Sequence, residues 1–184
     1  MSSLGTVTIV NSTFAANHGS SGSALATGNS DVTINNSVFV DNAATGSPGA
    51  LNTNGGTLTA SNNVFFNNTA NGIRDDQDGY GTANFIVATA EPLEALGNFG
   101  GPTQTMPPLP GGAAICAGSI ALLPSGLTQD QRGFPRTSGT CVDAGAVQIT
   151  QTPAAVPGLS MPLLALLAGL FAMFGIRRLR YATR

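Results

Sequence analysis

Apolar and polar residues alternate in three similar segments of the first seventy positions. Val7-Thr-Ile-Val-Asn-Ser-Thr-Phe14 is followed by Val32-Thr-Ile-Asn-Asn-Ser-Val-Phe39 and by Leu58-Thr-Ala-Ser-Asn-Asn-Val-Phe65. The phenylalanines recur after 39 − 14 = 25 and 65 − 39 = 26 positions, and Ala24-Leu25 recurs as Ala50-Leu51. Alternation of this kind predicts short strands with one buried face.

Three short strands and three turns within about 25 residues are typical of one coil of a parallel β-helix. We therefore predict an all-β fold in which residues 1–90 form about three coils. Equivalent residues are expected to stack in columns, with the asparagine amides bonded to one another and their backbones at positive φ. The predicted columns are Asn11, Asn36 and Asn62, and Phe14, Phe39 and Phe65. An ordinary β-sandwich core is the alternative explanation of the phenylalanine column.

The start of the chain is expected to leave an open strand edge. About three coils are the minimum for a stable stack, and an uncovered first coil invites aggregation. Met1-Ser-Ser-Leu-Gly5 has neither the basic start nor the apolar stretch of a signal peptide. We therefore expect that coils and an export signal are missing at the N-terminus.

Composition and charge restrict the class of protein further. Charged residues make up 9% of the chain, and there are 24 Gly and no Trp. Helices with solvated faces need the charged residues that are scarce here, so a mostly helical soluble fold is disfavoured. Before residue 150 the chain has three Arg and nine carboxylates, so the net charge of this part is 3 − 9 = −6. An acidic body of this kind is a poor partner for nucleic acid.

After Phe85 the repeat is lost, and residues 91–150 are rich in Gly, Pro and Thr. This composition predicts turns and extended chain that close off the stack. Cys116 and Cys141 can form one bridge if the protein is exported, or remain two free thiols. The charged side chains of this region are expected to form a structural network that pins the closing loops: Asp130, Arg132, Arg136 and Asp143.

Four motifs in this region occur in a characteristic order: Gly-Asn-Phe-Gly-Gly-Pro-Thr-Gln-Thr from position 97, Leu-Pro-Gly-Gly-Ala-Ala-Ile-Cys-Ala-Gly from 109, Asp-Gln-Arg-Gly-Phe-Pro-Arg from 130, and Cys-Val-Asp-Ala-Gly-Ala-Val from 141. In these motifs the chain resembles the choice-of-anchor Q domain of bacterial surface proteins. The resemblance implies a right-handed, pectate-lyase-like β-helix. Cys116 stands where that family usually has an acidic residue, which favours a disulfide with Cys141.

The tail has a different character from the rest of the chain. Leu159 to Ile176 is apolar, and as a helix its 18 residues span about 27 Å, close to the bilayer thickness. The arginines that follow place the C-terminus in the cytoplasm and the body outside: Arg177, Arg178, Arg180 and Arg184. We predict a linker at 151–158 and a transmembrane anchor at 159–184. A buried core helix is the alternative.

The beginning of this tail also resembles PEP-CTERM sorting signals, in particular the variant that begins Ile-Pro-Thr-Leu. The matching element is Val156, Pro157, Gly158, Leu159 and Ser160, with Gly in place of the usual Thr. The resemblance implies processing by an exosortase-like enzyme at the bacterial membrane.

Candidate catalytic residues are scarce, and we predict none. His18 lies in a Gly/Ser loop with no evident acid or nucleophile beside it. Asp31 and Asp41 lie on the coils, and glycoside hydrolysis needs two carboxylates flanking one bond. Asp75, Asp76 and Asp78 precede Gly in a pattern that suits Ca²⁺, but the bidentate Glu of a full calcium loop is absent. A solvated loop is the alternative, and we expect no other cofactor.

Three functional hypotheses follow. The first is a non-catalytic, membrane-anchored cell-surface module that binds polysaccharide or another surface ligand in the manner of an adhesin. The second is a fragment of a polysaccharide lyase or glycoside hydrolase whose active site lies on other coils. The third is a remnant gene product with no function.

Overall fold

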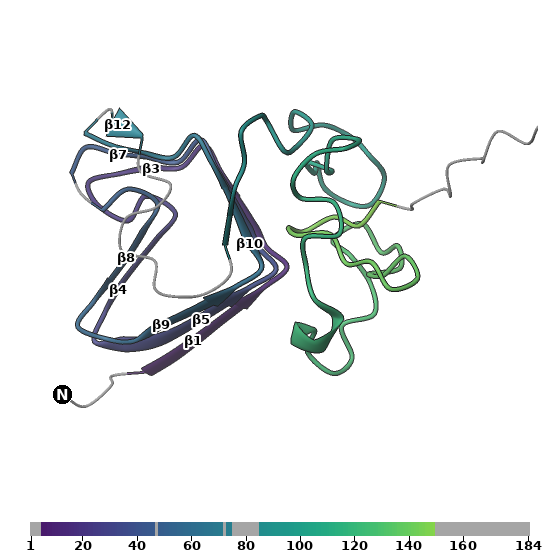
Figure 1. Ribbon diagram of the computed structural model, residues 1–184, viewed down its shortest axis with the longest axis horizontal. Coiled ribbons are helices and arrows are strands. Elements are labelled where there is room, and N and C mark those ends of the chain that lie inside the picture. The colour runs from purple at the N-terminus through teal and green to yellow at the C-terminus, as the bar shows by residue number, and fades with distance from the viewer. Residues whose placement is uncertain (1–4, 47, 72, 75–84, 150–184) are drawn as a thin grey trace, which may run out of the picture. The chain divides into compact units, whose positions relative to one another are not determined.

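The computed structural model describes residues 5–46, 48–71, 73–74 and 85–149 of the 184-residue chain (Figure 1). All of them belong to one compact unit, Met1–Thr150, and Gln151–Arg184 form a second unit outside the described residues. The described part consists of short strands with a single short 3₁₀-helix, η1 (Ile120–Leu122). The all-β prediction is confirmed.

The strands are arranged in three successive layers; the first two follow the same path through four strands, and the third follows it through the first three (Figure 1). The first layer contains β1 (Gly5–Val10), β2 (Thr13–Ala15), β3 (His18–Gly19) and β4 (Leu25–Gly28). The second layer contains β5 (Ser30–Asn35), β6 (Val38–Val40), β7 (Ala43–Ala44) and β8 (Leu51–Asn54). The third layer contains β9 (Leu58–Ser61), β10 (Asn63–Phe66) and β11 (Thr69–Ala70). Two more strands follow, β12 (Ile73–Arg74) and β13 (Phe85–Val87).

Equivalent strands of successive layers pair in parallel and form four sheets, β1-β5-β9, β13-β10-β6-β2, β12-β11-β7-β3 and β4-β8. The register joins residues 25 or 26 positions apart, as in Val7 with Val32 and Phe39 with Phe65. Within the described residues, the pairing of β11 with β12 is antiparallel. β13 adds a fourth strand beside β10 that the sequence repeat does not predict.

Left-handed residues recur where the layers turn. Asn11, Asn36 and Asn62 connect the first sheet to the second, with φ of 47°, 52° and 56°. A second column follows the phenylalanine strands, at Ala16, Asp41 and Asn67, with φ of 53°, 54° and 53°. Asn and Asp tolerate this backbone region better than other residues with a side chain, so the composition suits the corners.

Large apolar side chains fill the interior of the layers. Val32, Ile34, Phe39, Leu51 and Phe65 are buried there. The rings of Phe14, Phe39 and Phe65 stack at 4.9 Å between successive centroids, with interplanar angles of 1° and 9°. Phe85 of β13 then meets Phe65 edge to face, at 5.9 Å. Parallel pairing of neighbouring strands does not fit a β-sandwich, whose sheets are antiparallel.

A second apolar cluster lies on the outer face of the phenylalanine sheet. Val38, Val40 and Val64 point away from the interior and pack against residues of the segment 88–149, which we call the C-terminal segment. The partners from this segment include Ala88, Leu93, Ala114, Ala117 and Ala144. The C-terminal segment therefore lies beside the layers (Figure 1), against the outer face of one sheet.

Several predictions concern residues outside the described part. They are the calcium loop Asp75, Asp76 and Asp78, the sorting element Val156–Ser160, and the anchor 159–184. Among the residues that the structure describes, no helix is long and apolar enough to cross a membrane.

Candidate functional site

The first asparagine column joins the layers to the C-terminal segment. Asn36 and Ser119 form a reciprocal pair, with Asn36 Nδ2 donating to the Ser119 carbonyl at 3.0 Å and the Ser119 N–H donating to Asn36 Oδ1 at 2.9 Å. Asn62 Nδ2 donates to the Ala117 carbonyl at 2.9 Å, and Asn11 Nδ2 to the Asp143 carbonyl at 3.2 Å. The positive φ predicted for this column is present. The amide-to-amide bonding expected of the stacked asparagines is absent from this column, because these side chains point outward toward the C-terminal segment.

Amides bond to one another in a different column, at Asn17, Asn42 and Asn68. Asn17 Nδ2 donates to Asn42 Oδ1, and Asn42 Nδ2 donates to Asn68 Oδ1, both at 2.9 Å. The backbone N–H groups of Asn17 and Asn42 donate to the same two oxygens. Asn42 and Asn68 are fully buried, so this ladder satisfies polar groups that would otherwise be costly inside the protein.

Cys116 and Cys141 are joined by a disulfide, the pairing that the family resemblance implies. Their Cα atoms are 4.8 Å apart. The bond lies beside the buried Asp143, whose Oδ1 accepts the Cys116 N–H at 2.8 Å. Although these three residues lie close enough to resemble a metal site, metal binding by cysteine requires free thiolates. The two sulfurs are bonded to each other, so the cluster is structural.

Asp130 is the centre of a dense hydrogen-bond network. Its buried carboxylate pairs with Arg132 at 2.9 Å and accepts backbone N–H groups from Arg132, Phe134 and Gln148. Burial alone raises the pKa of Asp130. The hydrogen bonds, led by those from Gln148 and Arg132, outweigh burial, so the net pKa lies below the ordinary value. The guanidinium of Arg132 also lies 4.8 Å from the centre of the Phe134 ring.

Arg136 is buried with far fewer partners. It is 1% exposed, and its Nη2 donates to the backbone carbonyl of Asp143. The Asp143 carboxylate instead accepts the N–H groups of Cys116 and Ile149, each at 2.8 Å. The predicted network is therefore present only in part. Asp130 pairs with Arg132, and Arg136 forms no ion pair within the described residues.

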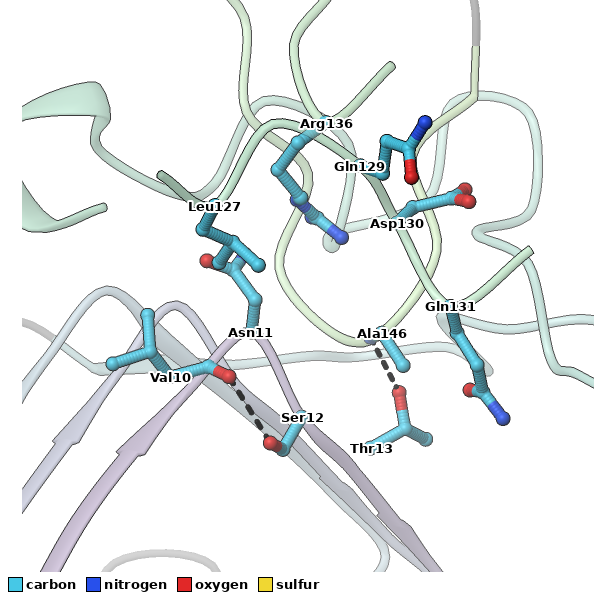
Figure 2. Close-up of a pocket in the computed structure, with 10 residues that line it drawn as sticks. All are labelled: Val10, Asn11, Ser12, Thr13, Leu127, Gln129, Asp130, Gln131, Arg136 and Ala146. Carbon is cyan, nitrogen blue, oxygen red and sulfur yellow. Dashed lines mark hydrogen bonds between the residues drawn. The ribbon is translucent and has the colours of Figure 1, made fainter. Parts of the chain in front are cut away.

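A pocket of about 440 Å³ opens where the corner of the first layer meets the C-terminal segment. Figure 2 shows Arg136 extending down from the C-terminal segment, while Asp130 and Gln131 turn their polar ends away from it. The polar residues lining the pocket are Asn11, Ser12, Thr13, Gln129, Asp130, Gln131 and Arg136.

Three buried atoms at this pocket have no hydrogen-bond partner within the described part of the chain. They are Nε and Nη1 of Arg136 and Oδ1 of Asn11. Buried polar groups in proteins are nearly always satisfied, by protein, water or ligand. Because Arg136 and Asn11, which carry these atoms, both line the pocket, it is the strongest candidate for a binding site among the described residues.

Sequence reasoning did not find this pocket. It selected Arg136 only as a structural residue and Asn11 only as a turn residue. The two halves of the pocket are far apart along the chain. Ala146 and Thr13, for example, are 133 positions apart and are joined by a hydrogen bond from the Ala146 N–H to Thr13 Oγ1. The repeat contains no signal that this corner faces the motif at 130–136.

The other candidate residues are placed apart from this pocket. His18 is exposed, and its Nδ1 lies 3.1 Å from the Ala16 carbonyl. Asp31 accepts hydrogen bonds from Thr57 of the next layer, and Asp41 accepts one from Asn67. These aspartates therefore join successive layers. Burial raises the pKa of Glu91, the Leu93 N–H opposes this, and the nearby charge of Asp41 raises it further.

Comparison of the chain with protein-family models, with curated proteins and with solved structures gave no match.

Proposed function

We propose that this chain is a parallel β-helix module of a bacterial cell-surface protein, tethered by its C-terminal tail, which binds glycans without cleaving them. The main support for the β-helix is the in-register parallel pairing of equivalent residues, through three layers in three of the sheets and through two layers in the sheet β4-β8. A right-handed sense, the choice-of-anchor Q assignment and the sorting tail with its exosortase-like partner rest on sequence resemblance.

The disulfide supports a location outside the cytoplasm. Disulfides persist in oxidising compartments and are rare in reducing ones. The Cys116–Cys141 bond joins two parts of the C-terminal segment, and the Cys116 N–H donates to buried Asp143. The apolar run at 159–176 is followed by four arginines. This pattern predicts a membrane anchor that leaves the rest of the chain outside the cytoplasm, as the disulfide does.

The hydrogen bonds that the carboxylates accept support binding rather than catalysis. Glycosidases need one acid that can release a proton and a second carboxylate placed about 5–9.5 Å away. Asp130 and Asp143 each accept several N–H groups, and Asp31 and Asp41 hold neighbouring layers together. An anionic carboxylate that is held by N–H donors is a poor proton donor.

A carbohydrate-cleaving enzyme is the second candidate, and Glu91, whose pKa is raised by burial and further by the charge of Asp41, is the residue that tests it. A raised pKa beside another carboxylate is typical of a general acid. If this candidate were correct, Glu91→Gln would abolish product release.

The experiment that separates the candidates incubates the full chain with immobilised neutral and acidic polysaccharides. We expect the protein to be retained while reducing ends and unsaturated sugars stay at the level of a protein-free control. Release of either product, lost in Glu91→Gln, would replace our proposal with the enzyme. Absence of retention on every polysaccharide would contradict glycan binding.

A further inference from the structure

The first layer is open on the side away from the second. Strands β1, β2, β3 and β4 each lie at the edge of their sheet, and within the described residues no strand pairs with them on that side. The C-terminal segment lies to one side of these strands rather than over them (Figure 1). Half of the N–H and C=O groups of an edge strand point away from its one partner. An extended strand laid along this edge would supply the missing hydrogen bonds.

The apolar interior is also uncovered at this layer. Four of its apolar side chains pack against the inner cluster but are only partly buried: Val7, Ile9, Phe14 and Leu25. Their register partners in the second layer are fully buried, as Phe39 is beside Phe14. At the opposite end of the stack, Phe85 packs against Phe65, which is fully buried too. The two ends therefore differ, and the first exposes apolar surface as well as backbone groups.

The first layer lacks the usual features that keep strand edges apart. Natural edge strands are protected by charged side chains, proline or bulges. Residues 5–28 contain no Asp, Glu, Lys, Arg or Pro. The remainder of the chain before residue 150 has a net charge of 3 − 9 = −6, which makes two copies repel each other there. The first layer is therefore a surface at which two copies can meet without like-charge repulsion.

We propose that two copies of this chain associate through their first layers, with β1 of one copy pairing antiparallel to β1 of the other. A two-fold interface of this kind brings the same surface of both copies together and covers the open side of each. With the pair centred on Thr8, Thr8 lies opposite Thr8 of the second copy, and Val7 lies opposite Ile9 of the second copy. Val7 and Ile9 both pack against the inner cluster, so this register joins apolar side chains on the same face. The inference goes beyond the proposed glycan binding and does not depend on it.

The test is sedimentation velocity of the full chain in detergent over a series of protein concentrations, where we expect a reversible dimer. Thr8→Lys sets two like charges directly opposite each other and should weaken the dimer at least about tenfold. Thr59→Lys is the matched control, because Thr59 is exposed and stands in the same column of the register but on β9 of the third layer. It should leave the dimer unchanged. Circular dichroism checks that both variants fold.

A cross-link tests the register independently of the charge. Residues directly opposite each other in an antiparallel pair have Cα atoms about 4.5–5.5 Å apart, which a disulfide can bridge. In oxidised glutathione, Thr8→Cys should therefore give a disulfide-linked dimer on a non-reducing gel, and Thr59→Cys should not. A chain that stays monomeric, open-ended polymers, or equal weakening by the two lysine variants would overturn the proposal. So would a dimer that Thr8→Lys leaves intact, since another surface would then hold it together.

Discussion

Asparagine performs three tasks in this chain, and its position within the repeat decides which one. At Asn36 the residue adopts a left-handed turn and directs its amide to the C-terminal segment. At Asn42 the amide forms the middle of a ladder that crosses three layers. At Asn11, which lines the pocket, the side-chain oxygen is buried and has no partner among the described residues. One residue type fits all three because it tolerates positive φ and both donates and accepts.

We expect replacement of Asn42, the middle residue of the ladder, to lower the free energy of unfolding substantially. Asn42→Ala removes the acceptor of the Asn17 amide and the side-chain donor to the Phe14 carbonyl, while Asn68 Oδ1 keeps only the backbone N–H of residue 42. We expect a loss of about 1–3 kcal/mol in the free energy of unfolding for each buried group left unpaired, measured by urea denaturation. Asn54→Ala, at an exposed position, should change it by less than about 0.5 kcal/mol. Equal effects of the two variants would show that the ladder contributes no stability.

The lowered pKa of Asp130 predicts a dependence of stability on pH. A carboxylate whose folded pKa is depressed stabilises the protein fully above its unfolded pKa of about 3.9. That contribution is lost as the pH falls through the lower, folded pKa. Asp130→Asn should therefore unfold more easily than the unmodified chain at pH 6, and the gap should narrow toward pH 3. A gap that stays constant over this range, followed by thermal unfolding, would rule out this linkage.

At the scale of elements, the repeats could be predicted from the sequence and the contacts of the C-terminal segment could not. Val-Thr-Ile alternation and the spacing of Phe14, Phe39 and Phe65 predict the parallel layers, because both depend on local period. β6 departs from alternation, since Val38, Phe39 and Val40 are all buried. An unbroken apolar strand signals that both faces are covered. It does not identify the covering segment, and nothing local distinguishes the two asparagine columns.

The disulfide is the link that holds the C-terminal segment in its turn-rich form. Replacing both Cys116 and Cys141 with Ser opens a loop with a sequence separation of 25. On the chain-entropy account we expect a loss of about 3 kcal/mol. The same loss should appear when the unmodified chain is unfolded in a reducing agent, and the agent should not affect the double variant. A double variant as stable as the oxidised chain would contradict this prediction.

At the scale of the unit formed by residues 1–150, stability depends on two apolar clusters that share one sheet. The inner cluster contains Phe39 and Phe65, and the outer one contains Val38 and Val64. The C-terminal segment reaches the outer cluster by a close approach at Gly145, whose N–H donates to the Asn36 carbonyl at 2.8 Å. A side chain at this glycine would meet the first and second layers at once.

Gly145→Ala tests this close approach against a matched glycine. Gly145 has φ of 94°, and an added Cβ would lie 2.8 Å from Thr13 Oγ1 and 3.1 Å from Val38 Cγ2. Gly126 has φ of 90° with no atom within 4 Å of such a Cβ. Both alanines carry the backbone cost of about 1–2 kcal/mol. Only Gly145→Ala should lose about 1–3 kcal/mol more through overpacking, measured by urea denaturation. Equal losses of stability in Gly145→Ala and Gly126→Ala would mean that the structure around Gly145 accommodates the added methyl group.

The C-terminal segment bonds to Asn11, Asn36 and Asn62, one residue from each layer. Repeat arrays normally contact only their nearest neighbours, so they can fray from an end, one repeat at a time. The C-terminal segment is hydrogen-bonded to all three layers, so the layers cannot unfold independently. Detaching one layer also breaks its hydrogen bond to this segment, which the other two layers share. The stack should therefore open in a single cooperative event, and its exposed first edge is held by the C-terminal segment as well as by the layer beneath it.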